Sequence, residues 1–232
     1  MNDAVSAVPG GSLIADEGPA TLYVEPPFQV NHPKYWNIPP EVSGGVILES
    51  MRRRLGWPNY AGKRILDFGC GVRLARTIAN LGLEIGQYVG IELQWPMVKW
   101  LRRNLPSPRF EFHHLKVANP FYLDSGPPME EVTALPVAGP FDLACMFSVI
   151  THQAPADAAR IFELLRLEAD RLYFTAALKP EVKTFAEEDP AHPRLYCKYN
   201  PTFLIGLVEE AGWRVERVYE GSHYQEQVVI AR

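Results

Sequence analysis

A short apolar run that leads into a glycine turn constrains the fold of this chain more than any other feature. Residues 64–68 read Arg-Ile-Leu-Asp-Phe, and Gly69 and Gly71 follow before a pattern typical of a helix over residues 74–81. An apolar run of this length, bounded by turn residues, is typical of a buried strand. The segment therefore predicts a strand, a tight turn and a helix, the first unit of a sheet whose strands are joined by helices.

The same alternation of strand and helix continues along the chain and predicts an α/β fold. The sheet is predicted to be doubly wound, with five parallel strands and a C-terminal antiparallel hairpin, whose turn is too short for a crossover between parallel strands. Residues 178–200 are expected to form a loop. The other predicted strands are 88–92, 109–114, 141–147, 171–177, 213–219 and 225–231, and the other helices are 96–104, 155–168 and 201–211.

The first 60 residues differ from the rest because they combine eight of the chain's 21 prolines with little periodicity. We expect residues 1–60 to form a tail, a Pro-rich arm and a helix over 42–55, and residues 61–232 to form the main domain. The arm contains Tyr35 and Trp36, which favour packing against another surface. It is a candidate lid over a substrate site, and the alternative is that it covers a hydrophobic edge.

Composition and charge exclude several classes of protein. Of 232 residues, 47% are hydrophobic and 22% charged, as in ordinary globular proteins. The net charge of −4 argues against a generic nucleic-acid binder, which is usually basic. No apolar run approaches the roughly 18 residues that a membrane helix needs. Cys70, Cys145 and Cys197 lie far apart, which argues against a disulfide framework and a zinc site, so we expect a cytoplasmic protein.

The glycine turn and the acid after it indicate a nucleotide-like ligand. Glycines let the backbone approach a ligand closely, and Glu92, at the end of the second predicted strand, suits the hydroxyls of a ribose. A dinucleotide site would need a third glycine where Leu74 stands, and Asp67 would repel a pyrophosphate. A carboxylate suits an ammonium group instead. A ligand with both an amine and a ribose is S-adenosylmethionine.

These segments resemble the class I SAM-dependent methyltransferases, a Rossmann-like family of seven-strand sheets, over residues 63–232. Leu66-Asp67-Phe68-Gly69-Cys70-Gly71 is similar to the first motif of the family, and Glu92 stands at its ribose-binding acid. Residues 141–152 resemble its fourth-strand motif, in the bacterial small-molecule branch whose strand ends in Ser-Val-Phe-Thr-His. No metal is expected, because His113 and His114 are adjacent strand residues and point to opposite faces.

The resemblance implies a set of cofactor-binding residues. Arg73 departs from the pattern, since it stands where the family often has a third glycine. Lys116 and Asn119 lie where many members have an acid for the adenine amine, so either Asn119 or a backbone amide is expected to bond the adenine instead. Cys70 on its own fits a small buried side chain. The implied residues are Asp67, Gly69, Cys70, Gly71, Glu92, Leu93, Asn119 and Ser148.

The resemblance also implies an activity: methyl transfer from S-adenosylmethionine to an oxygen or nitrogen of a small-molecule or sugar-like acceptor. His152 is the candidate general base, and the alternative is that it orders its loop. Ser148 and Thr151 are candidate loop-ordering or acceptor contacts. Tyr35, Trp36, Tyr196, Tyr199 and Tyr224 are candidates for the acceptor pocket or for hydrophobic cover. The other readings are an RNA or protein methyltransferase and a non-catalytic binding module of this fold, and the sequence leaves a homo-oligomer open.

Overall fold

The computed structural model describes residues 40–123, 125–220 and 226–232. The predicted N-terminal tail and arm, with Tyr35 and Trp36, lie outside the described residues, as does Tyr224. The lid and the boundary at residue 60 therefore stay predictions.

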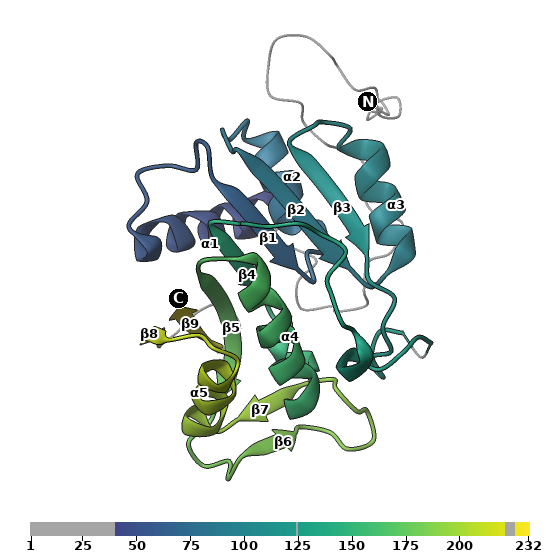
Figure 1. The fold of residues 1–232 in the computed structure, drawn as a ribbon, viewed down its shortest axis with the longest axis vertical. Helices are drawn as coiled ribbons and strands as arrows, with labels where there is room; N and C mark the ends of the chain where they lie inside the picture. Colours follow the sequence, from purple (N-terminus) through teal and green to yellow (C-terminus); the bar gives the residue numbers. More distant parts are fainter. Residues whose placement is uncertain (1–39, 124, 221–225) are drawn as a thin grey trace, which may run out of the picture.

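The centre of the fold is a parallel sheet of the predicted kind (Figure 1). Its strands stand in the order β3-β2-β1-β4-β5, and neighbouring strands are parallel. The order reverses between β1 and β4, and ligands of doubly wound sheets bind outside the carboxyl ends of the strands at this point. The bounds are β1 (Arg64–Phe68), β2 (Gln87–Glu92), β3 (Phe110–His114), β4 (Leu143–Met146) and β5 (Leu172–Leu178).

The predicted C-terminal hairpin is confirmed. It consists of β8 (Val215–Tyr219) and β9 (Gln227–Ala231), which pair antiparallel. β9 also pairs antiparallel with β5, where Phe174 lies opposite Val229. Because β9 runs against the parallel strands, the residues at its start lie at the edge of the sheet where those strands end.

The expected loop over residues 178–200 is wrong in part. It contains two short strands, β6 (Phe185–Glu187) and β7 (Cys197–Tyr199), so the described sheet has nine strands and not the predicted seven. β7 pairs parallel with the end of β5, and β6 pairs antiparallel with β7. Three residues are too few to show a strand periodicity, so pairing with β5 decides their conformation.

Helices cover both faces of the sheet (Figure 1). The side chains of β1 alternate between the two layers: Ile65 packs with α1, α2 and α3, whereas Leu66 and Phe68 pack with α4 and α5. Burial on both faces explains the near-continuous apolar runs of the strands. The bounds are α1 (Pro40–Leu55), α2 (Arg73–Asn80), α3 (Trp95–Asn104), α4 (Pro155–Glu168) and α5 (Pro201–Glu210).

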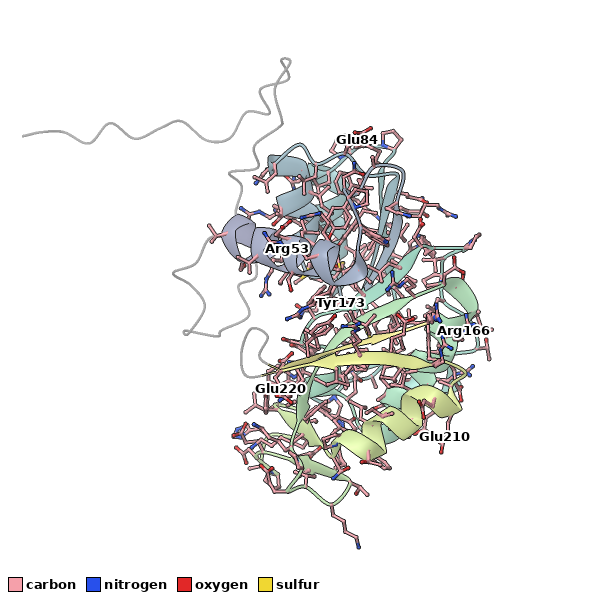
Figure 2. All side chains as sticks on the ribbon, turned by 90° about the vertical axis from the view of Figure 1, so that its left-hand side faces the viewer. Arg53, Glu84, Arg166, Tyr173, Glu210 and Glu220 are labelled. Atoms are coloured by element: carbon pink, nitrogen blue, oxygen red, sulfur yellow. The ribbon has the colours of Figure 1, made fainter. Side chains whose placement is uncertain are left out.

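The helix predicted at residues 42–55 is present as α1 and lies against the sheet. Met51 is fully buried in the same core cluster as Ile65. Arg54 Nη1 donates a 3.1 Å hydrogen bond to the Tyr173 hydroxyl of β5. Figure 2 shows α1, which carries the labelled Arg53, crossing this face beside Tyr173. Among the described residues, we find no helix with the length and apolar character needed to cross a membrane.

Candidate functional site

The glycine turn after β1 forms one end of the site. Gly69 and Gly71 have φ angles of +72° and +50°, a conformation that favours glycine. A Cβ atom at Gly69 would lie 2.6 Å from Cγ2 of Val149, so this position has no room for a side chain. The amides of Gly69 and Cys70 both donate to the Ile91 carbonyl of β2, at 2.9 and 3.0 Å. The turn is thereby fixed against the end of the second strand.

Glu92, the last residue of β2, holds its carboxylate beside this turn. The residue is 7% exposed. Its Oε2 accepts a 3.1 Å hydrogen bond from the Gly71 amide, and its Oε1 accepts from the amides of Leu93 and Gln94 at 2.9 and 3.0 Å. Burial raises the pKa of Glu92, and these three backbone donors act in the opposite direction. The carboxylate is therefore held in one orientation between the turn and α3.

A pocket of about 370 Å³ opens at the carboxyl ends of the parallel strands. Its volume is within the range of small-molecule sites, roughly 300–1,000 Å³. The structure brings most of the predicted site residues to its wall: Gly69, Gly71, Glu92, Leu93, Asn119, Ser148 and His152.

Asp67 and Cys70 are the two predicted site residues that do not line the described pocket. Asp67 points to the opposite face of β1 from Phe68, and its carboxyl accepts a 2.5 Å hydrogen bond from the Tyr88 hydroxyl. Burial raises the pKa of Asp67 to about 7, while hydrogen bonds from Tyr88 and Cys145 act to lower it. Cys70 is buried against Gly90, where an added Cβ would lie 2.7 Å from its Sγ atom. The side chains of both residues are thus buried in the protein and do not reach the pocket.

Asn119 joins two loops of the pocket. Its Nδ2 donates a 3.0 Å hydrogen bond to the His152 carbonyl. Its Oδ1 accepts from the amides of Phe121 and Tyr122 at 3.0 and 3.3 Å. The amide predicted to bond the adenine thus holds protein groups on both of its ends, and its clear role is to order the wall.

His152 ends a short 3-10 helix, Ile150–His152, after β4. Its Nδ1 lies 2.8 Å from the Arg194 carbonyl, and its ring is stacked on Phe121 at 5.1 Å and 2°. Tyr122 contacts the same ring edge-on at 5.2 Å. Because a carbonyl only accepts, Nδ1 carries the proton, and Nε2 is the basic nitrogen of the neutral ring. The ring is thus held in the tautomer that a general base requires.

Ser148, between β4 and this helix, has a φ of +56°, which is uncommon for a residue with a side chain. Its amide donates to Thr175 Oγ1 at 2.8 Å. Its hydroxyl donates to Glu226 Oε1 at 2.9 Å. Glu226 precedes β9, is 2% exposed and lines the pocket. Burial raises the pKa of Glu226, and the hydrogen bonds from Thr175 and Ser148 and the charge of Arg73 oppose this.

Sequence reasoning missed Glu226 and Tyr122 as wall residues. The signal for Glu226 was its place at the start of the last strand, which an antiparallel pairing brings to the edge where the parallel strands end. Of the described candidate tyrosines, Tyr196 lines the pocket. Tyr199 instead lies in β7, where its hydroxyl donates to the Gln153 carbonyl at 2.8 Å.

Comparisons with known proteins establish the fold. No family model matches the chain, and no curated protein matches it. Magnesium protoporphyrin IX methyltransferase from Synechocystis PCC 6803, with bound SAM, is similar over 82% of this chain and 78% of that chain, with 15% identity and a TM-score of 0.54. The glycopeptide N-methyltransferase MtfA, complexed with sinefungin, is similar over 81% of this chain and 93% of that chain, with 14% identity and a TM-score of 0.58.

A third solved structure is Burkholderia thailandensis 1,6-didemethyltoxoflavin-N1-methyltransferase. It is similar over 83% of this chain and 78% of that chain, with 18% identity and a TM-score of 0.54. At these identities, the likeness concerns the arrangement of the backbone. The chain therefore has the fold of the class I SAM-dependent methyltransferases, as its sequence predicts.

Proposed function

We propose that this protein transfers the methyl group of S-adenosylmethionine to an oxygen or nitrogen of a small-molecule acceptor. The observation that carries the proposal is the buried carboxylate of Glu92 on the wall of the pocket, beside the turn of Gly69 and Gly71. A fixed carboxylate suits the hydroxyl donors of a ribose. The turn leaves the backbone open to a ligand, because neither glycine presents a side chain.

The pocket wall carries further residues that suit the adenosine part of this cofactor. Leu93, Gln94 and Met97 follow Glu92 along the pocket and would contact the adenosine part, with Asn119 ordering the wall. Structurally similar methyltransferases were crystallised with SAM or sinefungin, which supports the same cofactor for this chain. When bound, the cofactor supplies a methyl group on a sulfonium, which is already electrophilic.

The acceptor would lie near His152. Tyr122, Thr151 and Tyr196 line the same pocket and give it a partly aromatic wall, which suits a small organic molecule. The protein's main task there is to align the acceptor, and alignment supplies up to about 7–11 kcal/mol in favourable systems. In this role, His152 Nε2 would take the proton that the acceptor oxygen or nitrogen loses.

One further observation supports the proposal. The net charge of −4 suits a small acceptor better than RNA, which would repel an acidic chain. We also infer a cytoplasmic location, because the three cysteines are buried and free, as is usual in a reducing compartment.

The first test is a calorimetric titration of the folded protein with S-adenosylmethionine and, separately, with S-adenosylhomocysteine. We expect saturable binding of both. If the folded protein binds neither ligand, the proposal is overturned, and a non-catalytic binding module of this fold remains. A second experiment follows a labelled methyl group from the cofactor. We expect it in the low-mass fraction of a cell extract, and label in RNA or protein would identify a macromolecular acceptor instead.

A further inference from the structure

An arginine lies on the pocket wall, at the position where the class I methyltransferases often have a third glycine in the turn. Arg73 is the first residue of α2, is partly buried and lines the pocket next to the glycine turn. No described residue forms a hydrogen bond or an ion pair with its guanidinium. A cation held in a partly desolvated pocket is costly unless an anion reaches it. The pocket thus presents, at its turn end, a guanidinium that no described residue holds by a hydrogen bond or an ion pair.

An acidic group of fixed orientation lies on the wall of the same pocket. The Glu226 carboxylate accepts from the Ser148 hydroxyl at 2.9 Å, and Ser148 is itself held by its amide bond to Thr175. Burial raises the pKa of both Glu226 and Asp67, and the positive charge of Arg73 opposes this rise at each carboxyl. Only Glu226 of these two acids lines the pocket.

One cation and one buried carboxylate on a pocket wall match a ligand that carries both charges. We propose that Arg73 binds the α-carboxylate of the methionine end of the cofactor, and that Glu226, with Ser148, receives its α-ammonium. This inference rests on the proposed function. Arginine suits the first role because its planar guanidinium donates two parallel hydrogen bonds to a carboxylate. Glu226 takes the ammonium contact that the sequence predicted for Asp67.

The inference has a direct physical consequence. Removing the carboxylate of the ligand should remove the contribution of Arg73 to the affinity, and removing the ammonium should remove that of Glu226. Three ligands separate them. S-adenosylhomocysteine carries both charges, its decarboxylated analogue keeps only the ammonium, and 5′-methylthioadenosine has neither. All three share the adenosine part, so their binding to Glu92 and the adenosine wall is a common reference.

The test is calorimetry of these three ligands with the parent protein, Arg73→Gln, Arg73→Lys and Glu226→Gln. Arg103→Gln is the matched control, because it removes the same charge from an exposed position of α3. We expect Arg73→Gln to weaken S-adenosylhomocysteine by about tenfold or more and to leave the other two ligands unchanged. Arg73→Lys should recover part of the loss. Glu226→Gln should weaken the two amine-bearing ligands and spare methylthioadenosine.

Each alternative result is decisive. An equal loss for all three ligands in Arg73→Gln would mean that the arginine only shapes the turn, and the inference would be wrong. Unchanged or tighter binding of S-adenosylhomocysteine by Arg73→Gln would also overturn it, and tighter binding would show that the side chain obstructs the pocket. If the parent protein binds none of the three ligands, the proposed function itself fails. Binding by the parent with no discrimination by Arg73 would refute this inference alone.

Discussion

The Tyr88 hydroxyl donates a 2.5 Å hydrogen bond to the Asp67 carboxyl, underneath the glycine turn. Tyr88 is fully buried and Asp67 is 2% exposed, so the pair lies within the layer formed by α1, α2 and α3 and not on the pocket wall. Burial raises the pKa of Asp67 from 3.8 to about 7. A residue predicted to contact the ligand is thus part of the support beneath it.

The raised pKa of Asp67 predicts a pH-dependent effect of Asp67→Asn on stability. Between pH 3.8 and about 7, the unfolded chain releases this proton while the folded protein keeps it, so the carboxyl costs stability as the pH rises. Asparagine is neutral throughout. We expect the free energy of unfolding of Asp67→Asn, relative to the parent, to increase by about 2.5 kcal/mol between pH 5 and pH 8. Urea denaturation at both pH values measures it, and a difference that does not change with pH would contradict the burial effect.

The contact between Gly69 and Val149 predicts different costs at the two glycines of the turn. An added Cβ at Gly69 would lie 2.6 Å from Val149 Cγ2, whereas at Gly71 it would meet no atom within 4 Å. Both substitutions by alanine carry a left-handed backbone cost of about 1–2 kcal/mol. Gly69→Ala should cost about 1–3 kcal/mol more because of the overlap. Thermal and urea unfolding compare the two variants, and equal losses would show that Val149 moves aside freely.

Strands β1 and β5 were predictable because they are buried on both faces and read as nearly continuous apolar runs. The glycine turn and Glu92 were predictable because each lies directly at the end of a predicted strand. The position of Asp67 follows from the alternation of side chains along a strand: Phe68 faces the pocket, so Asp67 must face the other way. The prediction for Asp67 considered its place beside the glycine turn and not the face of the strand from which its side chain projects.

Other parts of the site depend on contacts that a single sequence does not display. Glu226 reaches the pocket because β9 pairs antiparallel with β5, and the sequence does not show that its side chain faces the pocket and not solvent. The hydrogen bond from His152 to the Arg194 carbonyl joins residues 42 positions apart. β6 and β7 are three residues each, so their pairing with the sheet decides their structure.

The fixed carboxylate of Glu92 predicts a loss of cofactor affinity in Glu92→Gln. The substitution removes the charge and replaces one accepting oxygen by a donating amide, which opposes either the bond from the Gly71 amide to Oε2 or the bond from the Leu93 amide to Oε1. We expect S-adenosylhomocysteine to bind about 1.5–3 kcal/mol more weakly, as is typical of a lost charged hydrogen bond. Glu84→Gln is the control, because Glu84 is exposed in the loop between α2 and β2 (Figure 2). Calorimetry on both variants gives the comparison.

Two results would separate binding from folding in that experiment. If Glu92→Gln melts at the parent's temperature but binds weakly, the carboxylate acts on the ligand. If Glu92→Gln binds S-adenosylhomocysteine like the parent, Glu92 is not the residue that contacts the ribose, and the pocket binds its ligand without this carboxylate.

The orientation of His152 predicts a selective loss of turnover in His152→Gln. The histidine ring is held by the Arg194 carbonyl and by Phe121, and glutamine keeps a donor for that carbonyl but has no basic nitrogen. Turnover of the true acceptor should fall by about 10²- to 10⁴-fold. The affinity for S-adenosylhomocysteine should stay near that of the parent, because the ring lies at the acceptor part of the wall.

A matched control separates proton transfer from loop ordering. His113→Gln alters a histidine of β3 that bonds Glu111 outside the pocket, so its turnover should equal the parent's. A base contributes to the rate constant of the chemical step, whereas a residue that only orders the loop affects acceptor binding. A fall in kcat with little change in KM therefore supports the base. A rise in KM at constant kcat would leave His152 with the structural role alone, and the acceptor would then lose its proton to water or need to lose none.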